Sequence, residues 1–276
     1  MSSGPVAPRF LFLLVLALAL TACPACRRSE RGGLTVAGST SVQPIAELLA
    51  DQYMATHPGV TVNVQGGGSS AGIHAALSGA ADIGMSSREL KPEETGLQTV
   101  LLARDAIALI VHPGNPIRSL TKEQVRGIFC GRVRRWETVG GRPADITFIT
   151  REEGSGTRGA FEELVMGKDV EIAPDAIVQD STGAARAIVA GDPNAIAYIS
   201  LGMVTPEVAA VALDGVEPSE QSAASGHYKL TRPFLLLTHG EPSPQAQAFL
   251  DFVLTPESQA TVAEEGYIPA QPPATR

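Results

Sequence analysis

The chain has 276 residues and a formal net charge of −8, and 44% of its residues are hydrophobic. This length is enough for one large domain or two lobes with their own cores. The acidic balance argues against nucleic acid as a partner, and the five histidines and three cysteines show neither metal-ligand spacing nor a disulfide framework. We therefore expect no metal and no cofactor.

The first 22 residues have the pattern of an export signal. Arg9 is the only charge before an apolar run that is too short to cross a bilayer. The sequence Leu-Thr-Ala-Cys at 20–23 looks like a bacterial lipobox, so we expect a signal peptide at 1–22, a lipidated Cys23 and a polar tether at 23–33. The protein is then expected in the periplasm or at the cell surface, anchored to a membrane. The alternative is an ordinary secretory signal in which Cys23 is incidental.

From residue 34 onward, short apolar strands alternate with helical stretches. Strands are expected at 34–37 and 60–64, on either side of a helix at 42–56 whose apolar residues recur at helical spacing. This order is typical of a βαβ opening. The pattern next predicts a helix near 73–78 and strands at 82–85 and 106–112.

The segment Pro113-Gly114-Asn115-Pro116 ends the last of these strands, and the alternation then starts again. The restart predicts an α/β fold of two lobes, each a mixed sheet flanked by helices, joined by two crossing strands. We expect lobe 1 at 34–105 and 230–276, lobe 2 at 106–229, and the ligand in a cleft beyond the strand ends. The remaining predicted elements are strands at 146–150, 177–179, 196–199 and 234–238, and helices at 121–129, 157–166, 183–190, 244–254 and 256–265.

Three loops rich in Gly, Ser and Thr, at 37–41, 66–72 and 154–157, each join a predicted strand to a predicted helix. The first turn of a helix leaves backbone N–H groups without partners and carries about half a positive charge. Three such loops that meet would form a site for a small anion. Arg151 precedes the third loop, and its guanidinium supplies paired donors that fit a tetrahedral oxyanion. These residues predict a binder of phosphate or of a close relative of phosphate.

Each loop taken alone is also typical of a helix cap or a surface turn without a ligand. We expect Ser41 or a neighbour to cap the first helix and Ser155 to cap a later one. Ser87 and Arg88 end another predicted strand, where a solvated turn is the alternative. Arg132, Arg134, Arg135 and Trp136 form a basic cluster, which we interpret as a solvated face and not as a nucleic-acid site.

The second loop also allows an enzymatic interpretation. Gly68, Ser70 and Gly72 match the Gly-x-Ser-x-Gly pattern of a hydrolase nucleophile elbow, with Asp192 or Asp214 as the acid and His239 as the base. Too few residues lie between 33 and 66 for the strands that normally precede such an elbow. A phosphate-ester hydrolase therefore stays the alternative to a binding protein.

Six motifs follow one another in a specific order along the chain. They are 37–41, 68–70, 82–88, Ile128-Phe129-x-Gly131 with Trp136, 151–158 and 195–200. In this order they resemble the phosphate-binding proteins that serve bacterial phosphate ABC transporters, which belong to the two-lobed, type II periplasmic binding protein superfamily. The resemblance covers most of the chain after residue 33.

The resemblance implies a role for each motif residue. Thr40 and Ser41 would bind phosphate with hydroxyl and N–H groups, Arg151 would contact it through a guanidinium oriented by Glu153, and residues 155–157 would close the site from lobe 2. Ser87 stands where some members have an Asp that accepts the phosphate proton, which puts the discrimination against sulfate in question. The implied ligand-binding residues are Thr40, Ser41, Ser69, Ser87, Arg151, Ser155, Gly156 and Thr157.

The resemblance also implies a mechanism and partners. The lobes would close over inorganic phosphate, and the closed monomer would deliver it to the transmembrane subunits of an ABC permease without catalysis. A tethered phosphate sensor or scavenger would use the same site residues and is the second alternative.

Overall fold

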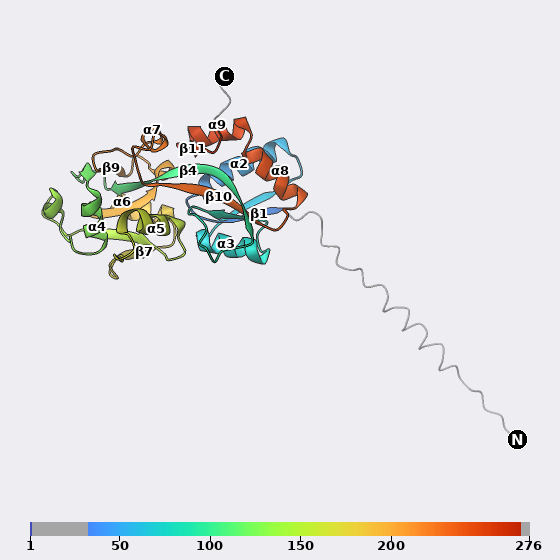
Figure 1. Ribbon diagram of the computed structural model, residues 1–276, viewed down its shortest axis with the longest axis horizontal. Coiled ribbons are helices and arrows are strands. Elements are labelled where there is room, and N and C mark those ends of the chain that lie inside the picture. Colours follow the sequence, from blue (N-terminus) through green and yellow to red (C-terminus); the bar gives the residue numbers. More distant parts are fainter. Residues whose placement is uncertain (2–32, 272–276) are drawn as a thin grey trace. The chain divides into compact units, whose positions relative to one another are not determined.

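Two strands, β4 (Leu97–Val111) and β10 (Thr231–His239), run side by side through the folded chain (Figure 1). The computed structural model describes Met1 and residues 33–271, so Cys23 and nearly all of the predicted signal peptide and tether lie outside the described residues. The first part of β4 pairs antiparallel with β10, and its last five residues, Ile107–Val111, pair with β8 (Ala195–Ser200). One strand thus belongs to both halves of the sheet.

The first half of the sheet is built on the predicted βαβ opening. β1 (Leu34–Gly38) lies between β2 (Val62–Gly66) and β3 (Ile83–Ser86), all parallel, and β10 follows in antiparallel orientation. Successive side chains of a strand face opposite sides of a sheet. Accordingly Phe234 and Leu236 pack in one cluster with residues of three helices, α2 (Gln43–Thr56), α8 (Pro244–Val253) and α9 (Pro256–Glu264), whereas Leu235 and Leu237 pack with α3 (Ser69–Ser78).

The second half follows the same rule. β8 pairs with β4 and with β6 (Thr147–Arg151), and β7 (Ile177–Gln179) lies beyond β6. Ile107, Leu109 and Val111 of β4 pack in a cluster with residues of α4 (Lys122–Phe129) and α5 (Gly156–Phe161). Ala108 and Ile110 face the other side, in a cluster with residues of α6 (Thr182–Gly191).

The buried clusters divide along the chain at the strands that the two halves share. Two clusters draw their buried residues from 34–103 and 234–267, and the other two draw theirs from 106–230. We propose on this basis that lobe 1 consists of 34–105 with 230–276 and lobe 2 of 106–229. β4 and β10 lie where these lobes join.

Several elements differ from the sequence expectations. β4 begins at Leu97 and not at 106, because its first part, in which polar residues interrupt the apolar ones, pairs with β10. α3 begins at Ser69 and not near 73, so the second loop is shorter than expected. α5 continues as a π-helix over Glu162–Met166. The elements that the pattern did not predict are β5 (Ser119–Leu120), β9 (Ala209–Leu213), β11 (Ile268–Pro269), α7 (Glu220–Ala224) and two 3₁₀ helices (Trp136–Val139 and Leu201–Met203).

Within the part of the chain that the structure describes, no helix combines the length and apolar character needed to cross a membrane. The same residues contain no cluster of three or more His, Cys, Asp or Glu side chains that could hold a metal ion.

Candidate functional site

The three predicted loops meet in space. The N–H of Ser39 donates to the carbonyl of Met85 (3.0 Å), and the N–H of Gly68 donates to the carbonyl of Gly38 (3.0 Å), so the ends of β1, β2 and β3 lie together. The third loop arrives from lobe 2, where the carbonyl of Gly154 accepts from the N–H of Ser70 (3.0 Å). Loops far apart in sequence therefore share one location, as predicted.

Gly156 of lobe 2 lies close against lobe 1. A side chain at this position would clash with the hydroxyl oxygens of Ser69 and Ser87. Ser69, Ser87 and Ser39 are buried and linked, because Ser39 Oγ donates to Ser87 Oγ (2.9 Å) and the N–H of Ser87 donates to Ser69 Oγ (3.0 Å). The first turn of α5 thus lies directly against the serines of lobe 1.

A second set of hydroxyls, Thr40, Ser41, Thr157 and Thr182, bridges the lobes. Ser41 Oγ lies 2.9 Å from Thr157 Oγ1 and 3.1 Å from Thr182 Oγ1. Thr40 Oγ1 lies 3.3 Å from Thr182 Oγ1. The structure brings Thr40, Ser41 and Thr157 together as predicted, and adds Thr182, which the sequence reasoning missed although it follows β7 as the other site hydroxyls follow strands.

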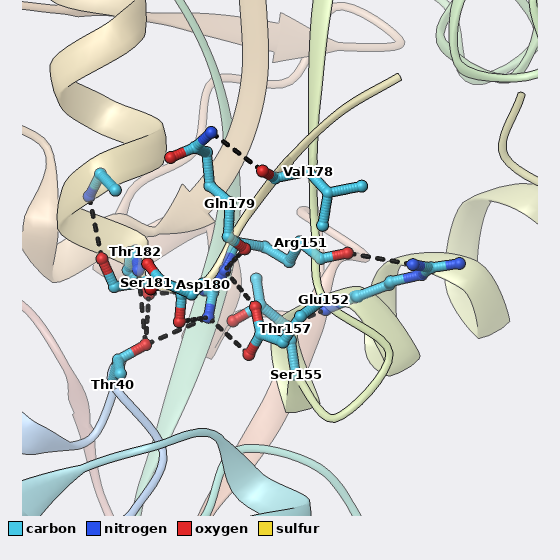
Figure 2. A network of polar contacts seen from close by, with 12 residues as sticks. Thr40, Arg151, Glu152, Ser155, Thr157, Val178, Gln179, Asp180, Ser181 and Thr182 are labelled. Atoms are coloured by element: carbon cyan, nitrogen blue, oxygen red, sulfur yellow. Dashed lines mark hydrogen bonds and ion pairs between the residues drawn. The ribbon is translucent and has the colours of Figure 1, made fainter. Parts of the chain in front are cut away.

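Arg151 lies in the middle of this set, at the end of β6, and its side chain is 2% exposed. Its two terminal nitrogens donate to Thr182 Oγ1 (3.0 Å) and Thr40 Oγ1 (3.2 Å), and the second also donates to Glu152 Oε1 (3.0 Å) (Figure 2). Burial lowers the pKa of Arg151, and the neighbouring carboxylate of Glu152 opposes this change. The guanidinium is held by groups from both lobes.

The expectation that Glu153 orients Arg151 is wrong. Glu152 is the residue in contact, because its Oε2 accepts from Arg151 Nε (3.0 Å) and its Oε1 accepts from the second terminal nitrogen. Glu153 is exposed in the turn that follows. Glu152 directly follows the end of β6 and lies beside Arg151, whereas Glu153 belongs to the turn that leads away from Arg151.

The two cap predictions have different outcomes. Ser155 Oγ accepts from the N–H of Arg158 (3.3 Å) and caps α5, as predicted, while Gly156 and Thr157 form its first turn. Ser41 does not cap α2, whose N-cap is Val42 without a side-chain bond. The hydroxyl of Ser41 bonds Thr157 and Thr182 instead, so it is directed into the space between the lobes.

Arg232 and Asp105 are further buried residues at this site that sequence reasoning missed. Nη1 of Arg232 donates to Thr157 Oγ1 (2.7 Å), and its other nitrogens donate to Asp105 Oδ2 (3.0 and 2.9 Å). Burial raises the pKa of Asp105, and the charge of Arg232 opposes this rise. The sequence feature that could have identified Arg232 is its position as a charged residue within the apolar strand β10.

The residues of the alternative hydrolase do not form a catalytic arrangement. Ser70 Oγ accepts from Arg88 (3.3 Å), and the carboxylates of Asp192 and Asp214 accept from the backbone N–H groups of Asn194 (2.8 Å) and Lys122 (2.9 Å). Within residues 33–271, no hydrogen bond joins Ser70 to a histidine. Among the described residues, Ser70 thus has no histidine partner that could act as its base.

The three arginines of the basic cluster are exposed and paired with acids, whereas Trp136 is buried in the core of lobe 2. Arg132 contacts Glu123, Arg134 contacts Asp175, and Arg135 contacts Glu137 and Asp145. This pairing agrees with the interpretation as a solvated face.

The chemistry of the site is that of a donor-rich anion site. Hydroxyls and the first turns of α3 and α5 supply neutral donors, and two guanidiniums supply positive charge. The two carboxylates in contact with these guanidiniums, Glu152 and Asp105, are each committed to an ion pair.

Comparison with known proteins agrees with this description. The model of the PBP superfamily domain matches residues 25–257. A Phosphate-binding protein PstS of Bacillus subtilis is 31% identical over 245 residues, which covers 86% of this chain and 81% of that protein. The PstS of Pseudomonas aeruginosa is also 31% identical, over 269 residues, with 86% and 83% covered.

Solved structures give the same result. A crystal structure from Clostridium perfringens, described as a phosphate ABC transporter substrate-binding protein with bound phosphate, has a TM-score of 0.85 and 40% identity, and covers 87% of this chain and 100% of that one. An ABC-type phosphate transport receptor from Vibrio cholerae has a TM-score of 0.71 and 38% identity, with 85% and 99% covered. These structures confirm the predicted two-lobed α/β fold. The chain belongs to the PBP superfamily and, within it, to the family of the PstS phosphate-binding proteins.

Proposed function

We propose that this protein is a solute-binding protein that captures inorganic phosphate between its two lobes and delivers it to the permease of an ABC transporter. The observation that carries the proposal is the meeting of Thr40 and Ser41 from lobe 1 with Arg151, Thr157 and Thr182 from lobe 2. The relatives named as phosphate-binding proteins support the choice of ligand.

The number of donors suits a phosphate dianion. Removing such an ion from water costs on the order of tens of kcal/mol by a Born estimate, so nearly every lone pair must meet a donor. We assign these donors to Thr40, Ser41, Ser69, Ser87, Arg151, Ser155, Gly156 and Thr157, and we add Thr182. Most of them are neutral, so the site stabilises the anion without a large excess of fixed positive charge.

Closure of the lobes is the proposed mechanism. The hydroxyl of Ser41 bonds Thr157 and Thr182 directly, so the structure is that of a closed form. In an open form, lobe 1 offers Thr40, Ser41, Ser69 and Ser87 to the ligand, and Arg151 with residues 155–157 then closes over it. Phosphate would take over hydrogen bonds that these groups now make with one another.

The remaining parts of the assignment are part of the same proposal. The protein acts as a monomer in the periplasm or at the cell surface, held to a membrane by lipidated Cys23. In this proposal it performs no chemistry on its ligand, in line with the relatives that are named as binding proteins. A tethered sensor or scavenger would bind phosphate in the same way. To separate transport from sensing, phosphate uptake is measured in cells that lack this protein and in the same cells after the protein has been restored.

Calorimetric titration of the purified and refolded mature chain tests the proposal. We expect heat of binding for phosphate at micromolar concentrations, and we compare arsenate, sulfate and molybdate in the same buffer. Sulfate is the informative comparison because, by the resemblance, Ser87 stands where some family members have an Asp, whose charge would repel an ion without a proton. The absence of phosphate heat would end the proposal.

A further inference from the structure

Arg232 and Asp105 form a buried ion pair between the two strands that join the lobes. Arg232 lies on β10, Asp105 lies opposite it on β4, and they are 2% and 1% exposed. Asp105 Oδ2 accepts two bonds from Arg232, and its Oδ1 accepts from Ser200 Oγ of lobe 2 (2.9 Å). Both carboxylate oxygens are therefore committed, and the position of the guanidinium is set by the connecting strands.

Nη1 is the part of Arg232 that Asp105 does not hold. It donates to Thr157 Oγ1 of lobe 2 at 2.7 Å and approaches the carbonyl oxygen of Ser87 of lobe 1 at 3.5 Å. Thr157 is in the first turn of α5, and its side chain is among those that close the proposed site. Arg232 thus reaches from the junction of the lobes to a hydroxyl of the binding site.

This contact decides the direction in which Thr157 donates. A guanidinium has only donors, so the hydroxyl of Thr157 accepts from Arg232 and cannot donate to it. The hydrogen of Thr157 must then point away from Arg232, and Ser41 Oγ lies 2.9 Å from Thr157 Oγ1. The same pattern occurs at Arg151, which donates to the hydroxyls of Thr40 and Thr182.

Resting on the proposed function, we propose that Arg232 is a positioning residue that keeps the Thr157 hydroxyl as a donor to the bound anion. Arg232 acts through Thr157 and does not itself contact the ligand. Asp105 holds Arg232 in place and neutralises its charge. The anion oxygen that meets Thr157 consequently accepts a hydrogen bond from it, because Thr157 has its hydrogen to give and its lone pair toward Arg232 is occupied.

A double-mutant cycle on phosphate affinity tests this role. Replacing the pair together, Asp105→Asn with Arg232→Met, avoids an isolated buried charge. We expect this replacement to weaken phosphate binding about tenfold when Thr157 is present, and less than about twofold when Thr157→Val has already removed the hydroxyl. A role limited to the fold would produce the same loss in both backgrounds, and that result would overturn the inference.

A second ion pair, in lobe 1 and mostly buried, provides the control. Arg88 and Glu94 are bonded at 2.7 Å, and Arg88 donates to Ser70 and not to Thr157. Arg88→Met with Glu94→Gln should leave the phosphate affinity within about twofold of the unchanged protein. An equal loss of affinity in this control would mean that removing any buried pair weakens binding, and would contradict the inference.

If the protein with the paired replacement does not fold, Arg232→Lys is used as the test variant instead. The lysine keeps a charge for Asp105, but one ammonium group cannot reproduce the two contacts to Asp105 and the contact to Thr157. The affinity should fall with Thr157 present and stay unchanged in the Thr157→Val background, whereas equal effects would overturn the role of Arg232. The unchanged protein is titrated in parallel, so a failure of phosphate binding itself, which refutes the proposed function, is distinct from a failure of this inference.

Discussion

The hydroxyl oxygens of Ser41 and Thr157 lie 2.9 Å apart although 116 positions separate the two residues in the chain. Ser41 belongs to the first loop of lobe 1, and Thr157 belongs to the first turn of α5 in lobe 2. Their contact requires that the lobes be closed. The predictions below depend on the groups around this contact.

Arg151→Ala should weaken phosphate binding by about 3 kcal/mol, or more than about a hundredfold, because it removes a buried, charge-assisted donor. Arg186→Ala is the control, since Arg186 lies on α6, as Thr182 does, but its one hydrogen bond within the described residues goes to the carbonyl of Met203 (3.1 Å). Calorimetry on both variants gives the comparison. An unchanged affinity for Arg151→Ala would place Arg151 outside the site.

Thr182→Val should weaken phosphate binding about tenfold, because the hydroxyl that bonds Arg151, Thr40 and Ser41 is lost. Its neighbour Ser181 caps α6 by accepting from the N–H of Ala184 (3.1 Å). Ser181→Ala should therefore lower the free energy of unfolding by about 1 kcal/mol and leave the affinity unchanged. Equal phosphate affinities for Thr182→Val and Ser181→Ala would mean that the Thr182 hydroxyl takes no part in binding.

Gly156→Ala should abolish tight phosphate binding, because the added methyl group meets Ser69 and Ser87 when the lobes close. Gly183 lies in α6 with open space around it, so Gly183→Ala should keep the affinity and add up to about 1 kcal/mol of stability. Titration and thermal unfolding of both variants separate closure from folding. Binding of normal strength by Gly156→Ala would show that the lobes need not approach as closely as described here.

The Arg88–Glu94 pair should make folding stability depend on pH. The side-chain bond from Arg88 lowers the pKa of Glu94 below its usual value of 4.5. Ionised Glu94 therefore stabilises the fold above that value, and this contribution is lost as the pH falls through the lowered pKa. Urea unfolding at pH 7 and near pH 3 should show a smaller loss of stability for Glu94→Gln than for the unchanged protein. Equal losses would mean that Glu94 is not stabilised by Arg88.

Much of the fold was predictable because strand and helix periodicities are local. The α2 segment has the expected position almost to the residue, since its apolar residues recur at helical spacing. The β7 segment also has the expected position, although Ile177 and Val178 are exposed in the structure. The beginning of β4 could not be predicted in this way. Its first part is partly exposed and is held by pairing with β10, which lies more than a hundred residues later in the chain.

The site was predictable where its residues belong to strand-to-helix loops. Thr40, Ser41, Ser69, Arg151 and Thr157 all lie where such loops predict them. Arg232 and Asp105 belong to no loop motif, and only the pairing of β4 with β10 brings them together. The choice between Glu152 and Glu153 as the partner of Arg151 depends on how the chain turns after β6, which adjacent identical residues do not reveal.

A crystal structure of the mature chain with bound phosphate tests the central claim most directly. We expect the phosphate oxygens within about 2.6–3.2 Å of donors on Thr40, Ser69, Arg151 and Thr157 at the same time, with the two lobes closed around the ion. Phosphate bound elsewhere, or held by one lobe while Thr40 and Arg151 face solvent on separate sides, would contradict the account.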